Sequence, residues 1–172
     1  SLFPFSELKG SKREIEEETA GNGVLKVFIG APYSQLHYQI GEPVLIYRKY
    51  TGDKGRAGYK SAVTSFCTIA NIIIVKNAKQ PRIPLNDFVG QAGNKTVFTE
   101  EELRNLYYQK NNLVLLELLY NGYFGKGHNV NFSTLKQAGL FEEYPYNIKY
   151  SPIQFKSILE MGDVDVQNVI IN

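Results

Sequence analysis

The stretch "KSAVTSFCTIANIIIV" (residues 60–75) decides the fold that we predict for this chain of 172 residues. It is rich in β-branched residues and apolar in both alternations, which is typical of a strand buried on both faces. Its sixteen residues would extend about 50 Å at about 3.3 Å each. A compact domain of this size has a radius of gyration of only about 16 Å. We therefore predict that the strand bends or contains bulges, as strands of small barrels do.

Other elements follow from periodicity and from capping signals. We predict further strands over residues 23–33, 41–50 and 111–120. Thr99 with Glu102 three residues later forms a capping-box pattern, and Ser151 before Pro152 marks a second helix start. A shorter helix should run from Ser133 to Gly139. This order predicts an α+β domain with a curved mixed or antiparallel sheet and flanking helices.

Composition indicates one globular domain, because 43% of the residues are hydrophobic and 21% are charged. Residues 7–22 are highly charged, so we expect a flexible linker or loop over residues 1–21 and the domain over residues 22–172. The chain begins with serine, and we expect it to be part of a longer protein. The lone Cys67 excludes an internal disulfide, and neither a signal-peptide pattern nor a membrane-length apolar run is visible. These features predict a cytoplasmic protein without membrane attachment.

The charge of the chain is unevenly distributed. The net charge is +2, yet the segment from Arg48 to Arg82 contains eight basic residues and one acid, Asp53. That segment therefore carries +7 and the rest of the chain −5. An asymmetry of this kind indicates an anionic partner such as nucleic acid or a nucleotide, although lysines that only solvate exposed loops would give the same count.

Signals for metal or nucleophile chemistry are weak in this sequence. His37 and His128 lie in separate polar stretches, and we expect both in exposed loops. Cys67 lies among apolar neighbours, which predicts a buried and inert thiol. The glycines of "TGDKGRAGYK" match neither phosphate-binding pattern, and the acids at residues 100–102 suit a helix start. We therefore assign no catalytic residue, metal site or cofactor.

Several stretches together resemble a known family. They are "GEPVLIYRKY" and "YKSAVTSFCTIANIII", followed by "KTVFTEEEL", "NNLVLLELLYNGYF" and "GLFEEYPYNIKYSPIQFKSIL". Their order resembles the PUA-like domain of the ASCH and EVE type that follows an acetyltransferase (GNAT) domain in many bacterial proteins. The resemblance covers residues 22–160 and implies a PUA-like pseudobarrel whose cleft accepts RNA or a modified base. It also implies an upstream acetyltransferase domain as a partner.

If the strand over residues 44–50 lies next to the start of the strand over residues 60–75, the ends of the two strands share one rim. We expect a binding site at that rim. Tyrosines there would stack on bases, cations would bind phosphates, and hydroxyls would meet base or sugar edges. Tyrosines that only pack the barrel are the structural alternative. The predicted residues for single-stranded RNA or a nucleotide are Tyr47, Arg48, Lys49, Tyr50, Arg56, Tyr59, Lys60, Ser61, Thr64 and Ser65.

Three functions remain open at this point. The first is a nucleic-acid or nucleotide binding module without catalysis of its own. The second is a small hydrolase on the same fold, for which Lys26, Thr64 and Glu117 are the candidate residues. The third is a regulatory domain that contacts another protein, for instance a fused acetyltransferase.

Overall fold

The β-branched and apolar run that follows Lys60 forms the longest strand of the protein, in a computed structural model that describes residues 2–4, 25–33, 38–50, 57–125, 127–142 and 148–165. The strands are β1 (Leu2–Pro4), β2 (Leu25–Gly30), β3 (Pro43–Arg48), β4 (Ala62–Asn77), β5 (Gln80–Pro81), β6 (Leu113–Tyr123) and β7 (Val130–Asn131). The helices are α2 (Ala57–Lys60), α3 (Leu85–Ala92), α4 (Glu100–Gln109), α5 (Phe132–Gln137) and α6 (Pro152–Met161).

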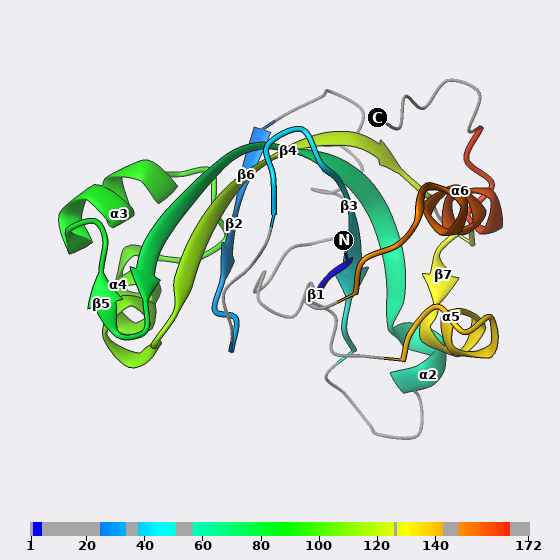
Figure 1. Ribbon diagram of the computed structural model, residues 1–172, viewed down its shortest axis with the longest axis horizontal. Coiled ribbons are helices and arrows are strands. Elements are labelled where there is room, and N and C mark those ends of the chain that lie inside the picture. The colour runs from blue at the N-terminus through cyan, green and yellow to red at the C-terminus, as the bar shows by residue number, and fades with distance from the viewer. Residues whose placement is uncertain are drawn as a thin grey trace.

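The strands form one sheet with β4 at its centre. The order is β1-β3-β4-β6-β2, and β5 and β7 also pair with β4. Every pairing is antiparallel except that of β1 with β3. Figure 1 shows β4 and β6 arching together across the molecule, with helices gathered at the two ends of the arch. The prediction of an α+β domain with a curved, mostly antiparallel sheet is therefore confirmed.

The sixteen residues of β4 bend through local irregularities, as its length required. Its register against β6 shifts at three places, and its register against β3 shifts once. The shift against β3 occurs because Ser65 pairs with Ile46 and Val63 with Tyr47, which leaves Thr64 as an extra residue. Because of this extra residue, Val63 and Phe66 pack into the same apolar cluster.

Two helical layers cover opposite ends of the arch (Figure 1). At one end, α3 and α4 pack on β2, β4 and β6 through a cluster that includes Phe88, Leu103 and Leu115. At the other end, α5 and α6 pack on β3 and β4 through Leu135, Phe155 and neighbouring residues. Between them, the side of the sheet that carries Cys67 holds a third apolar cluster. Cys67 is fully buried, as predicted.

The helix starts follow their caps. Thr99 Oγ1 accepts from the Glu102 amide at 3.3 Å, and Glu102 Oε2 accepts from the Thr99 amide at 3.0 Å. The second predicted capping pair also forms, with Pro152 in the first turn of α6. The third helix differs from the prediction, because its N-cap is Asn131 rather than Ser133. Asn131, two positions earlier, already accepts from the Thr134 amide through its side-chain oxygen.

Some elements were not predicted from the sequence. They are the four-residue helix α2, the eight-residue helix α3 and the short strands β1 and β5. Strand β1, which belongs to the sheet, lies inside the range 1–21 where we expected a linker or loop. The rest of that range lies outside the described residues, so the boundary stays a prediction.

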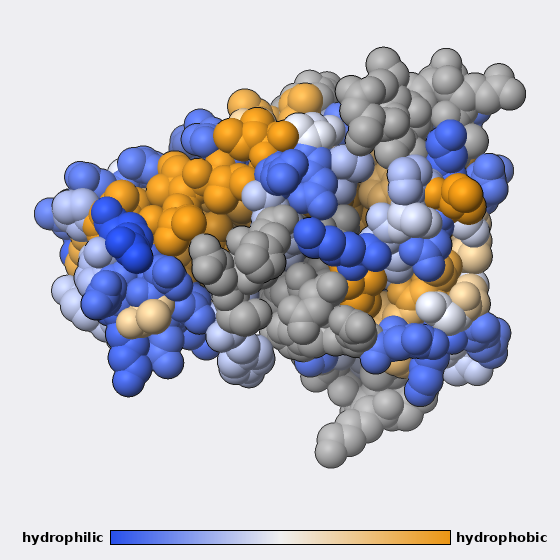
Figure 2. Space-filling model, in the orientation of Figure 1, coloured by the Kyte–Doolittle hydropathy of each residue, from blue (hydrophilic) through white to orange (hydrophobic). Residues whose placement is uncertain are grey.

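Apolar surface gathers over the sheet between the α3 end and the centre of the molecule (Figure 2). Two strand residues with large exposed apolar side chains are Ile74 of β4, at 47%, and Leu119 of β6, at 37%. The sheet is thus not fully enclosed by the helices of the described part of the chain.

Candidate nucleic-acid interface

The end of β3 and the start of β4 share one rim of the sheet. Arg48 pairs with Ala62, and Tyr47 pairs with Val63. The short helix α2 leads into β4 and brings Tyr59 to the same end. This arrangement is the strand neighbourhood on which the predicted site depended.

A cavity of about 400 Å³ opens at this rim. Five of the predicted residues line it, and three further residues join them. None of the described residues that line it is acidic. The lining residues are Arg48, Lys49, Tyr50, Lys60, Ala62, Thr64, Tyr123 and Asn129.

Lys60 and Tyr50 form a contact pair on the wall of this cavity. Lys60 Nζ lies 4.7 Å from the centre of the Tyr50 ring and 3.5 Å from its hydroxyl oxygen. The Tyr50 amide donates to Ser61 Oγ at 2.9 Å. Ser61 does not line the cavity, and its hydroxyl is already used to hold Tyr50 in place.

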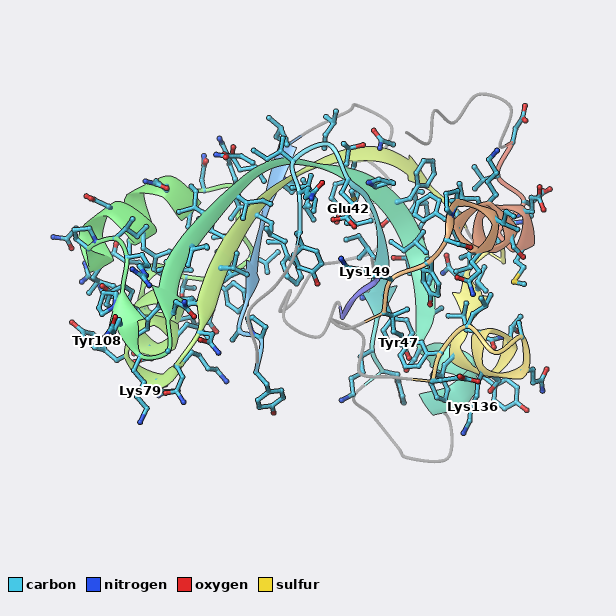
Figure 3. All side chains as sticks on the ribbon, in the orientation of Figure 1. Glu42, Tyr47, Lys79, Tyr108, Lys136 and Lys149 are labelled. Carbon is cyan, nitrogen blue, oxygen red and sulfur yellow. The ribbon has the colours of Figure 1, made fainter. Side chains whose placement is uncertain are left out.

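Tyr47 does not offer the stacking face that we predicted. Its side chain is 4% exposed, and its ring centre lies 5.0 Å from that of Phe141. Figure 3 shows Tyr47 beside β3, on the side of the segment that follows α5. Burial raises the pKa of Tyr47, and a hydrogen bond with Ser61 partly opposes that rise. The structural alternative, a tyrosine that packs the core, therefore holds for this residue.

The remaining predicted residues divide between surface and core. Tyr59 is 77% exposed but does not line the cavity. Ser65 is fully buried and lies opposite Ile46, whose cluster occupies the other side of the sheet. Its predicted contact with a ligand is therefore wrong. Arg56 lies outside the described residues.

Among the described residues, two polar oxygens in the cavity have no hydrogen-bond partner. They are Thr64 Oγ1 and Asn129 Oδ1, and both atoms are buried. The ladder between β7 and β4 pairs Val130 with Val63, so the next position along brings Asn129 beside Thr64. Asn129 was missed in the sequence because "GHNVNF" reads as an ordinary polar turn, and only the return of β7 to β4 places it here.

The basic segment from Arg48 to Arg82 does not form one surface. Three of its cations lie at the far end of β4 or near β5. They are Lys76, Lys79 and Arg82. Figure 3 shows Lys79 beside Tyr108 at the end of the molecule opposite Tyr47. Lys76 Nζ donates to the Tyr107 carbonyl at 2.6 Å, at the end of helix α4. The net charge of this segment is therefore larger than the number of cations at the cavity.

The three residues suggested for a hydrolase do not come together. Glu117 lies opposite Asn71 on β4, seven residues from Thr64 and so roughly 20 Å along the strand. Its ion-pair partner is Lys95, at 3.6 Å between Lys95 Nζ and Glu117 Oε1. Lys26 lies opposite Leu118, on the other face of the sheet from Glu117. The proposed catalytic constellation is not formed.

Other chemistry is sparse in the described part of the chain. His128 is half-exposed, as expected, with Nδ1 3.7 Å from Asp163 Oδ2, whereas His37 lies outside the described residues. Among the described residues, no group of three or more histidine, cysteine, aspartate or glutamate side chains is placed to hold a metal ion. None of the described helices combines the length and apolar character that crossing a membrane requires.

Comparisons with known proteins identify the fold. No model of a known protein family matches the sequence, and no curated protein matches it. The structure is similar to the crystal structure of ASCH from Zymomonas mobilis, with a TM-score of 0.58, 11% identity and coverage of 92% of each chain. A tyrosine-to-phenylalanine mutant of that protein gives a TM-score of 0.59 at 10% identity, over 92% of this chain and 95% of that one. A serine-to-alanine mutant gives 0.58 at 10% identity, over 93% and 94%.

These likenesses show the fold: the chain folds like the ASCH protein of Zymomonas mobilis. The predicted fold is confirmed at that level. The link to an upstream acetyltransferase stays a prediction.

Proposed function

We propose that this domain binds single-stranded RNA, or a nucleotide, in the cavity at the β3–β4 rim. The observation that carries the proposal is the convergence of three cations and two tyrosines on a cavity with no acid among its described lining residues. The cations come from two separate stretches of the chain, Arg48 and Lys49 at the end of β3 and Lys60 at the end of α2. Basic residues that only solvate exposed loops would have no reason to meet at one cavity.

The residues of the site would contact different groups of the RNA. Arg48, Lys49 and Lys60 would bind phosphates, with displacement of condensed counterions. The Tyr50 ring on the cavity wall, and the exposed ring of Tyr59 near the rim, would stack on bases. The three residues suggested for a hydrolase are not brought together, so we propose a binding module.

The experiment is a titration of a labelled single-stranded RNA at several salt concentrations, read by fluorescence anisotropy. Affinity should fall with salt at a log–log slope of about −0.7 per phosphate contact. Arg48→Ala and Lys60→Ala should weaken binding to all sequences and flatten the slope by about 0.7 each. Tyr50→Leu should weaken binding by about 1–3 kcal/mol with less change in slope, because stacking is not ionic.

Lys79→Ala is the matched control, because it removes the same charge at the opposite end of the molecule (Figure 3). It should leave affinity and slope near those of the wild type. Absence of binding at low salt, or an equal loss in Lys79→Ala, would contradict the proposal. A regulatory domain that contacts protein would then be the better reading.

An upstream domain, an acetyltransferase in the resembled arrangement, remains part of the proposal. In that arrangement the RNA-binding domain would bring its neighbour to RNA, in a bacterial cytoplasm. The coding sequence upstream of residue 1 tests this directly.

A further inference from the structure

The floor of the rim cavity carries hydrogen-bonding capacity that the protein leaves unused. Thr64 is 3% exposed, and its Oγ1 has no partner in the part of the chain that the structure describes. Asn129 Oδ1 is likewise buried and without a partner. Most buried polar side-chain atoms in proteins are hydrogen-bonded, so two neighbouring exceptions in one cavity indicate a missing ligand.

The backbone places both side chains here for no evident structural gain. Thr64 is the extra residue of the β4 bulge against β3, and bulges commonly re-aim a side chain beside a functional site. Its carbonyl accepts from the Phe124 amide at 2.9 Å, which holds the bulge against the end of β6. Asn129 is held next to it because Val130 and Asn131 pair with Val63 and Ala62.

The chemistry of these two groups restricts what can enter. Asn129 Oδ1 only accepts, so a phosphate oxygen has no favourable contact with it, and phosphates belong with the cations of the wall. The Thr64 hydroxyl can donate or accept. An acceptor beside a hydroxyl matches a ligand edge on which an amino group stands beside a ring nitrogen. Adenine, cytosine and guanine each have such an edge, whereas uracil presents a carbonyl oxygen where cytosine has its amino group.

We infer that Thr64 and Asn129 read the edge of one nucleobase in the cavity and select bases with an exocyclic amino group over uracil. This inference rests on the proposed RNA binding and adds a preference that cations and stacking do not supply. Asn129 Oδ1 accepts from the amino group, and the Thr64 hydroxyl donates to the ring nitrogen. The volume of about 400 Å³ lies within the range of small-ligand sites.

Cytosine and uracil give the sharpest comparison, because they have the same ring size and differ mainly at this edge. Anisotropy titrations with oligocytidine and oligouridine of equal length, at one salt concentration and neutral pH, should show about tenfold tighter binding of oligocytidine. Asn129→Ala and Thr64→Val should reduce that ratio to about one. Their salt slopes should match the wild type, because neither residue binds phosphate.

Asn129→Asp is the second variant, since its carboxylate keeps an acceptor at the same position. It should weaken binding of both oligomers, because the new charge opposes the phosphates, yet retain the preference for oligocytidine. Thermal unfolding of each variant confirms that it is folded before it is titrated. Thr64→Val is nearly isosteric, so it tests the inference even if Asn129→Ala is unstable.

The outcomes separate this inference from the proposed function. Salt-dependent binding with equal affinity for the two oligomers would overturn the inference and leave RNA binding intact. A preference for oligouridine, or a cytosine preference that survives both Asn129→Ala and Thr64→Val, would also overturn it. Failure of the wild type to bind either oligomer would overturn both.

Discussion

Gly122 of β6 lies opposite Phe66 of β4, and a Cβ atom on Gly122 would lie 2.3 Å from Cε1 of the Phe66 ring. Phe66 is 6% exposed and part of the cluster under α6, so its ring has little room to move. The absence of a side chain at Gly122 is therefore what allows the two strands to pair around this ring.

Gly122→Ala should destabilise the fold. The added methyl group forces the Phe66 ring or the strand to shift, and overpacking of this kind costs about 1–3 kcal/mol. Chemical denaturation should show a lower free energy of unfolding by that amount. Gly90→Ala is the control: a Cβ on Gly90 meets nothing within 4 Å, and it lies inside helix α3. That change should stabilise by about 0.5–1 kcal/mol. Equal effects at the two glycines would contradict the packing argument.

The hairpin between β4 and β5 should become more stable with a standard turn sequence. Its two loop residues, Ala78 and Lys79, have φ of 48° and 70°, which favour asparagine and glycine. The double change Ala78→Asn with Lys79→Gly should raise the free energy of unfolding by about 1–2 kcal/mol. Lys79→Ala leaves the backbone strain in place and should change little. A double variant no more stable than Lys79→Ala would count against strain at this turn.

Loss of the capping box on α4 should be measurable by the same method. Thr99→Ala removes the acceptor for the Glu102 amide and should cost about 1 kcal/mol. Glu101→Gln alters the same turn without touching the cap, and its effect should stay below about 0.5 kcal/mol. If the two variants unfold alike, the cap is not what stabilises this helix start.

The free energy of unfolding should fall at alkaline pH, because two tyrosines hold their protons more tightly in the folded protein than in the unfolded chain. Burial raises the pKa of Tyr150, and the nearby Tyr47 adds to that rise; burial also raises the pKa of Tyr47. Both groups lose their protons more easily in the unfolded chain. Their contribution is complete below the unfolded pKa of about 10 and declines as the pH rises above it.

Urea denaturation from about pH 8 to about pH 11 measures this decline. Tyr47→Phe should make it shallower, because the phenylalanine has no proton to lose. A decline as steep in Tyr47→Phe as in the wild type would mean that Tyr47 does not contribute.

Cys67 should react slowly with a thiol reagent in the native protein. It is fully buried in the cluster with Val44 and Ile69, so labelling must wait for the chain to open. Labelling should be fast in denaturant. Native labelling at the denatured rate would show that this side of the sheet is open to solvent.

Local sequence patterns were sufficient for the elements that depend on neighbours along the chain. The β-branched run after Lys60, its need to bend, and the caps at Thr99 and Ser151 are all present in the structure. The cap of α5 was wrong by two residues, because both Asn131 and Ser133 can accept a hydrogen bond. Sequence order also placed Arg48, Lys49, Tyr50 and Lys60 at one rim, since β3 and β4 are consecutive paired strands.

Tertiary structure alone decided how the site is built. A single extra residue at Thr64 changes the facing of every side chain before it on β4, because side chains alternate with a period of two. Burial of Tyr47 against Phe141 depends on α5 and α6, which lie far along the chain. Asn129 reaches the cavity only because β7 returns to β4. Local propensity cannot specify such contacts, because their free energy comes from partners that folding brings together.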